Sequence, residues 1–106
     1  MAEGRRHLKV TVTQSGGFVP VVTTTVADTE ALAPKDGRRL REKVKQADLS
    51  SRTLRPGEPA YAITIEDDDA TKVTLSESDL TDAHRDLIDF VGSVEGHEER
   101  IGPLGR

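Results

Sequence analysis

The sequence predicts an α+β fold of two layers, with one four-stranded antiparallel sheet and two helices on one of its faces. Four short segments alternate apolar with polar residues, which is the period of a half-buried strand. Each pair of these segments is followed by one whose apolar residues recur every three or four positions, as on one face of a helix. The order is therefore ββαββα, and the short connections within each pair favour antiparallel hairpins. At 106 residues the chain suits one domain with a modest core.

The first predicted hairpin lies near the N-terminus. Leu8, Val10 and Val12 alternate with lysine and threonine. Residues 18–26 are rich in valine and threonine, which suit a pleated, partly buried surface. Ser15-Gly16-Gly17 stands between the two segments. Because glycine adopts a positive φ without steric penalty, this junction favours a tight reversal of the chain.

The first predicted helix begins near Pro34, because the first helical position needs no backbone donor. Its apolar face consists of residues spaced by three and four, namely Gly37, Leu40, Val44 and Ala47. We expect residues 50–59 to form a loop, since Arg55-Pro56-Gly57-Glu58-Pro59 prevents regular structure.

The second predicted hairpin has the clearer alternation, and an acidic turn at 67–69 joins its strands. Its apolar positions are Tyr61, Ile63, Ile65, Val73 and Leu75. Thr81 is a suitable N-cap for the last helix, with Asp82 well placed against the helix dipole. The apolar stripe of that helix consists of Ala83, Leu87, Phe90, Val91 and Val94. Threonines at alternate strand positions indicate that the other face of the sheet is solvated.

These elements set the expected domain boundaries. Residues 7–94 form the single domain, and residues 1–6 form a flexible N-terminus. Residues 95–106 are charged and interrupted by glycines, which predicts a flexible C-terminal tail.

Composition excludes several classes of protein. The chain has no cysteine, so neither a disulfide nor a thiolate zinc site is available. The polar N-terminus lacks the apolar run of a signal peptide. No stretch approaches the roughly 20 apolar residues of a membrane span. We therefore expect a cytoplasmic protein with no membrane association.

Charge is distributed unevenly along the chain. Residues 1–55 contain 11 Lys and Arg against 6 Asp and Glu, whereas residues 56–106 contain 4 against 13. The basic cluster of the first helix consists of Lys35, Arg38, Arg39, Arg41, Lys43 and Lys45. A pI near 5.3 and few aromatic residues favour a solvated helix face over a nucleic-acid surface. Binding of a nucleic acid or an acidic partner through Arg38, Arg39, Arg41 and Lys45 is the alternative.

A search for catalytic chemistry gives no constellation. His7, His84 and His97 are far apart in sequence and form no pair with metal-ligand spacing. His84 falls in the apolar stripe of the last helix, which indicates a histidine at the core edge. The acidic turn at 67–69 lacks the alternating ligands and glycine of a calcium loop. We therefore expect no enzyme activity, no cofactor and no metal.

An ordered set of motifs carries a family resemblance. The motifs are Ser15-Gly16-Gly17-Phe18, Thr23-Thr24-Thr25, Leu32-Ala33-Pro34, Leu40 and Val44, Ala47-Asp48, Tyr61-Ala62-Ile63-Thr64-Ile65-Glu66-Asp67, Val73-Thr74-Leu75-Ser76-Glu77, Leu80 and Leu87-Ile88. In this order and spacing, over roughly residues 8–94, the sequence resembles emfourin, the protein inhibitor of protealysin and related thermolysin-like zinc metalloproteases.

The resemblance implies a partner and a mechanism. The partner would be a thermolysin-like metalloprotease, bound by a monomer that occludes the active-site cleft. Without cysteine or a ligand pair, the chain is not expected to remove the zinc. The first candidate contact is Ser15, Gly16, Gly17 and Phe18, with Phe18 as a hydrophobic plug, and the alternative is that Phe18 packs in the core. The second candidate is the loop that contains Arg55, Pro56 and Gly57. A small non-catalytic interaction module with an unknown partner is the rival function.

Overall fold

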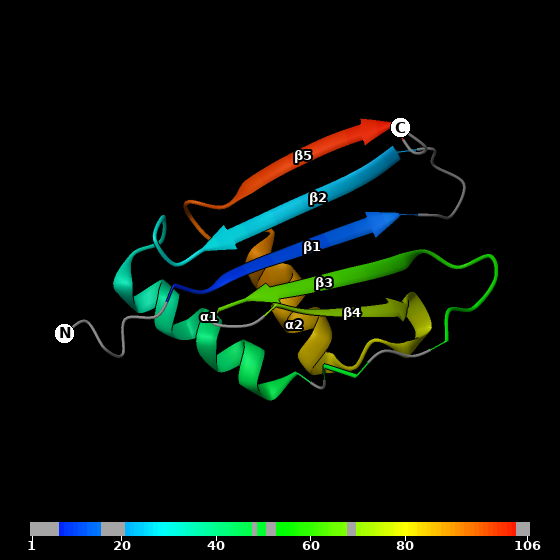
Figure 1. Ribbon diagram of the computed structural model, residues 1–106, viewed down its shortest axis with the longest axis horizontal. Helices are drawn as coiled ribbons and strands as arrows, with labels where there is room; N and C mark the ends of the chain where they lie inside the picture. Colours follow the sequence, from blue (N-terminus) through cyan, green and yellow to red (C-terminus); the bar gives the residue numbers. More distant parts are fainter. Residues whose placement is uncertain (1–6, 16–20, 48, 51–52, 68–69, 104–106) are drawn as a thin grey trace.

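The computed structural model describes residues 7–15, 21–47, 49–50, 53–67 and 70–103 (Figure 1). In chain order the elements are β1 (Lys9–Ser15), β2 (Val21–Asp28), α1 (Pro34–Gln46), β3 (Ala60–Glu66), β4 (Ala70–Ser76), the 3₁₀ turn η1 (Glu77–Asp79), α2 (Asp82–Val91) and β5 (Glu98–Pro103). The predicted α+β class with two helices and an antiparallel sheet is confirmed. The two hairpins are each followed by an α-helix, but the short turn η1 stands between β4 and α2, and a further strand follows α2.

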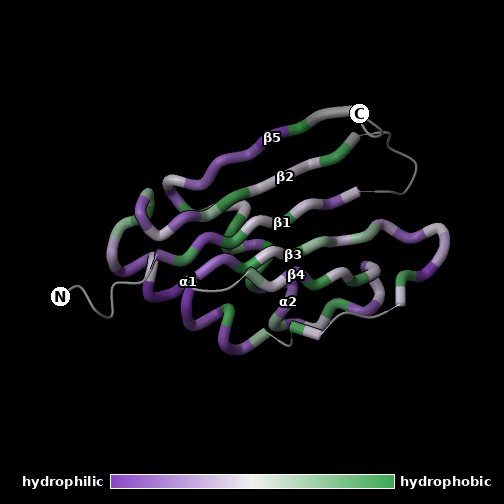
Figure 2. Tube along the Cα trace, in the orientation of Figure 1, coloured by the Kyte–Doolittle hydropathy of each residue, from purple (hydrophilic) through white to green (hydrophobic). Residues whose placement is uncertain are grey.

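The sheet has five strands, so the prediction of four is wrong. Its strand order is β4-β3-β1-β2-β5, and every neighbouring pair is antiparallel. The fifth strand lies in the segment expected to be a flexible tail, which is also wrong for Glu98–Pro103. The strand was not predicted because its sequence is charged and shows no apolar alternation. An edge strand can be held by backbone hydrogen bonds alone while its side chains stay in water. Figure 2 shows that β5 is mostly hydrophilic.

The chain returns to the sheet after α2 through a tight turn at Gly96. This glycine has a φ of 99°, and an added Cβ would lie 2.6 Å from the carbonyl oxygen of Ala31. Both the left-handed backbone and the close approach to Ala31 therefore require glycine at this position. The His97 amide donates to the Val94 carbonyl at 3.1 Å, which closes the turn before β5 begins.

Both helices cover one face of the sheet, and the core lies between the two layers. The core consists of Leu8, Val10, Val12, Ala27, Leu32, Leu40, Ala47, Ile63, Ile65, Leu87, Val91 and Val94. Leu40 of α1 and Leu87 of α2 are fully buried against the apolar positions of β1 and β3. Thr11 pairs with Val26 and Thr64 on the opposite face, where the side chains are only partly buried. The predicted division into an apolar and a threonine-rich face is confirmed.

Helix α2 begins with the N-cap predicted from the sequence. The Thr81 hydroxyl accepts from the His84 amide at 3.3 Å, and His84 Nδ1 accepts from the Thr81 amide at 3.0 Å. These reciprocal bonds form a capping box, with histidine in the place usually taken by glutamate or glutamine. The buried His84 is thus a helix cap at the core edge, as its position in the stripe predicted.

The basic cluster lies along α1, which is largely hydrophilic in Figure 2. Arg38, Arg39 and Lys45 are exposed, as a solvated helix face requires. Lys43 instead joins the two helices, because its Nζ lies 2.7 Å from Asp86 Oδ2 and 5.4 Å from the ring centroid of Phe90 on α2. Neither α1 nor α2, the helices of the described ranges, is long and apolar enough to cross a membrane.

Candidate protein-contact surface

The two loops predicted as contacts arise from the same end of the sheet. Ser15, the last residue of β1, pairs with Ala60, the first residue of β3. Ala60 in turn pairs with Ser76, the last residue of β4. We call this edge the Ser15 end; the connection from β1 to β2, the loop before β3 and η1 all start or finish there (Figure 1).

The first candidate contact is only partly described. Ser15 is half-buried at the end of the central strand β1, between β2 and β3. Gly16, Gly17 and Phe18 lie outside the described residues, so the choice between a contact and a core position for Phe18 stays a prediction. What the structure establishes is where the chain leaves β1 and re-enters the sheet in β2.

The second candidate contact is a well-defined turn. Arg55, Pro56 and Gly57 are all exposed. Gly57 has a φ of 81°, and the Glu58 amide faces the Arg55 carbonyl at 3.4 Å. Proline at the second position and glycine with positive φ at the third are the features of a type II turn. We call the four residues Arg55–Glu58 the Arg55 turn; its shape follows from the Pro-Gly pair.

Two hydrogen bonds fasten the Arg55 turn and Pro59, the residue after it, to the end of β4 and to Glu77. The Arg55 amide donates to Ser76 Oγ at 2.6 Å, and the Glu77 amide donates to the Pro59 carbonyl at 3.0 Å. Ser76 is completely buried, so its hydroxyl supplies an acceptor that water cannot replace. The turn is therefore held at both of its ends.

Side-chain bonds add a second connection between the same segments. Arg55 donates from its terminal nitrogen to Asp79 Oδ1 at 3.1 Å and from Nε to Asp79 Oδ2 at 3.4 Å. This hydrogen bond and the charge of Asp79 raise the pKa of Arg55, which stays cationic. The Glu58 carboxylate accepts from both the amide and the hydroxyl of Ser78 at 3.1 Å. Because Arg55 is exposed, its ion pair adds little stability, and its effect is to position the turn.

A substitution at Ser76 tests this arrangement. Ser76→Ala leaves the part-buried Arg55 amide without its acceptor, which we expect to cost about 1–3 kcal/mol of unfolding free energy. Urea denaturation measures the loss. Ser78→Ala is the matched control, because the exposed Ser78 hydroxyl can be replaced by water and should change stability by less than about 0.5 kcal/mol. Equal losses in the two variants would contradict the role given to Ser76.

Tyr61, which follows Ala60 in β3, also lies at the Ser15 end. It pairs with Gln14 and Leu75 and packs partly against the core. Partial burial, together with the nearby negative charge of Glu77, raises the pKa of Tyr61, so its phenol stays neutral. This end of the sheet therefore combines a partly buried aromatic side chain with a turn of defined shape.

The histidines occupy separate structural positions. His84 caps α2, and His97 contacts the Val94 carbonyl at 2.7 Å through Nδ1. His7 lies beside Asp28, which pairs with Lys9 at the end of the sheet opposite Ser15. Sequence reasoning missed both this grouping and the contacts of Ser76, Ser78 and Asp79, because their partners lie about 20 residues away in the chain.

The fold and this surface define a small α+β domain that presents a well-defined turn, Arg55–Glu58, at one end of its sheet. Residues 12–92 match the Emfourin family model, and the chain belongs to this family, whose members inhibit metalloproteases. The predicted resemblance is therefore confirmed. No curated protein and no solved structure matches the chain. Strand β5 lies outside the matched residues.

Proposed function

We propose that the protein inhibits a thermolysin-like zinc metalloprotease by placing the Ser15 end in the active-site cleft. The observation that carries this proposal is the pairing of Ser15 with Ala60, which brings two loops far apart in sequence to one edge of a domain of the emfourin family. Residues 16–20 and the Arg55 turn would together fill the cleft.

The physical basis of the proposal is preorganisation. A flexible substrate loses conformational entropy when a cleft orders it, and a loop that is already fixed avoids that cost. The Arg55 turn is fixed by its Pro-Gly sequence and by bonds to Ser76, Ser78 and Asp79. Residues 16–20 are bounded by two strands of the sheet. Backbone groups of such loops can add strand-like hydrogen bonds along a protease cleft.

The experiment is a titration of thermolysin with the protein before substrate is added. We expect activity to fall to near zero at about equimolar inhibitor and to stay low when excess zinc is supplied. Recovery with zinc would mean that the protein removes the metal, and this result would overturn occlusion. The variant His7→Ala is a control, because His7 lies beside Asp28 at the opposite end of the sheet and its replacement should leave inhibition unchanged. Full activity at large excess would favour the rival function, an interaction module with another partner.

The proposal includes a monomer that acts in the cytoplasm without nucleic acid. Two edge strands, β4 and β5, flank the sheet. Glu98, Glu99 and Arg100 place charges along β5, and such charges disfavour pairing between two copies. The exposed arginines of α1 would stay in water and would not contact phosphates. The affinity for the target should therefore depend much less on salt concentration than the affinity of a nucleic-acid-binding protein does. Light scattering at the concentration of the inhibition assay should give the molar mass of a single chain.

A further inference from the structure

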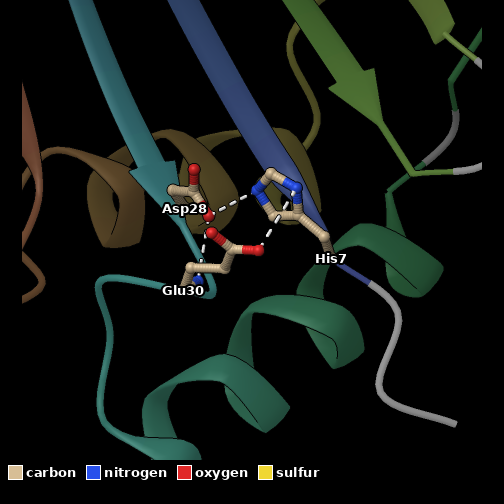
Figure 3. Close-up of side chains that lie close together, drawn as sticks. All are labelled: His7, Asp28 and Glu30. Atoms are coloured by element: carbon tan, nitrogen blue, oxygen red, sulfur yellow. Dashed lines mark hydrogen bonds and ion pairs between the residues drawn. The ribbon is translucent and has the colours of Figure 1, made fainter. Parts of the chain in front are cut away.

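A histidine and two carboxylates meet at the end of the sheet opposite Ser15. His7 immediately precedes Leu8, Asp28 ends β2, and Glu30 lies in the following turn (Figure 3). A ligand atom from each of the three side chains lies within 4.8 Å of one from each of the others. The side chains are 46%, 28% and 74% exposed, so ions in solution can reach them.

The backbone holds these three residues in place. The Leu8 amide donates to Thr29 Oγ1 at 3.0 Å, and the Thr29 amide donates to the Leu8 carbonyl at 2.9 Å. Leu8 is the residue after His7, and Thr29 stands between Asp28 and Glu30. This pair of bonds therefore holds the backbone of His7 close to the backbone of Asp28 and Glu30 before any ligand binds.

The two ring nitrogens of His7 have different surroundings. Nε2 lies 2.6 Å from Asp28 Oδ1, which is a hydrogen-bond distance, so this nitrogen carries the proton. In the neutral ring Nδ1 then has a lone pair, and it faces Glu30 Oε2 at 3.9 Å. That separation is too long for a hydrogen bond. Two negative or electron-rich atoms facing each other across this gap favour a cation between them.

The gap fits the bonds of a transition metal. Zinc binds imidazole nitrogen and carboxylate oxygen at about 2.0–2.2 Å, so a tetrahedral ion needs the two atoms about 3.4 Å apart. Glu30 is highly exposed and can move by the half ångström required. A metal-bound histidine usually donates its other N–H to a carboxylate, which fixes the tautomer. Asp28 already occupies that position.

We propose that His7 and Glu30 bind a divalent transition metal ion, with Zn²⁺ as the favoured ion, and that Asp28 positions the imidazole. Nδ1 of His7 and the Glu30 carboxylate are the ligands, and water completes the coordination. Mixed nitrogen and oxygen donors suit zinc, cobalt or nickel better than magnesium or calcium, which prefer oxygen alone. The site is independent of the proposed inhibition and lies away from the Ser15 end.

Isothermal titration of the untagged full chain with Zn²⁺ tests the proposal. We expect one equivalent to bind, and His7→Ala and Glu30→Gln to abolish that saturable binding. Asp28→Asn should weaken it by about 10–100-fold, because the amide cannot supply the same negative partner for Nε2–H. His97→Ala is the matched control, since His97 also lies near a carboxylate, with Nε2 4.0 Å from Glu99, and its loss should leave zinc binding unchanged.

Nitrogen-15 spectra of the histidine rings identify the ligand atom. Zinc should shift the Nδ1 resonance of His7 while its Nε2 stays protonated, and the His84 and His97 rings should not respond. Saturable binding that survives in His7→Ala, a metal-induced shift at Nε2 instead of Nδ1, or no binding at millimolar Zn²⁺ would each overturn the proposal. His7→Ala should lose zinc binding but inhibit a protease as well as the unsubstituted protein does. The zinc titration therefore tests the metal site alone, and the protease titration tests the proposed function alone.

Discussion

Replacing Phe18 by alanine is expected to weaken inhibition of a thermolysin-like protease by at least about 30-fold, the factor that corresponds to a hot-spot loss of 2 kcal/mol. Thermolysin-like enzymes are expected to have a primed-side pocket for large apolar side chains, and Phe18 follows Gly16 and Gly17 in the segment that joins β1 to β2. A phenyl ring that enters such a pocket would contribute most of its buried area only in the complex. Inhibition constants from enzyme titrations measure the effect, and thermal unfolding should not change.

Phe90→Ala is the control for this prediction. Phe90 is the other phenylalanine of the chain, and it packs partly against the core on α2 beneath Lys43. Its removal should lower stability more than inhibition. If Phe18→Ala lowers the unfolding temperature in parallel with inhibition, Phe18 is a core residue. The contact surface would then be reduced to the Arg55 turn.

Gly96→Ala is expected to lower the free energy of unfolding by more than about 2 kcal/mol. Alanine at a φ of 99° is strained by about 1–3 kcal/mol, and its Cβ would also collide with the Ala31 carbonyl oxygen at 2.6 Å. That oxygen belongs to the backbone, so the collision cannot be relieved by rotating a side chain. We expect the chain to move away from Ala31 and to release β5 from β2. Urea denaturation gives the loss of stability.

Gly57→Ala separates the two contributions. Gly57 also has a positive φ, of 81°, but no atom lies within 4 Å of an added Cβ. Its replacement should therefore cost only the backbone strain, about 1–2 kcal/mol. Equal losses at Gly57 and Gly96 would contradict the importance of the approach to Ala31. A larger loss at Gly96 would show that this approach helps to hold the fifth strand.

The fold was largely predictable because local periodicity determines most of its elements. Val10 and Ile63 mark strands by alternation, and Leu40 and Leu87 mark helices by their spacing; all four are fully buried. Strand β5 could not be predicted in this way. Ile101 is exposed, and the strand is held by backbone bonds to β2 more than 70 residues earlier in the chain. Such pairing leaves no local pattern of apolar residues.

The site was predictable only in part, for a related reason. The Arg55 turn follows from its own sequence, since Pro56 and Gly57 select the turn type without help from other segments. The bonds that fix it come from Ser76, Ser78 and Asp79, whose polarity alone indicates a solvated loop. The grouping of His7 with Asp28 likewise depends on the register between β1 and β2, which cannot be read from either strand alone.

The central position of β1 also bears on whether a protease could digest this protein. A protease cleaves a segment only after several residues on each side become extended and free, so cleavage follows the population of locally opened chain. The strands on both sides of residues 16–20 are interior strands, because β3 flanks β1 and β5 flanks β2. Drawing either strand into a cleft would break hydrogen bonds along two of its edges at once. A target protease bound at the Ser15 end would therefore cleave the segment between β1 and β2 only slowly.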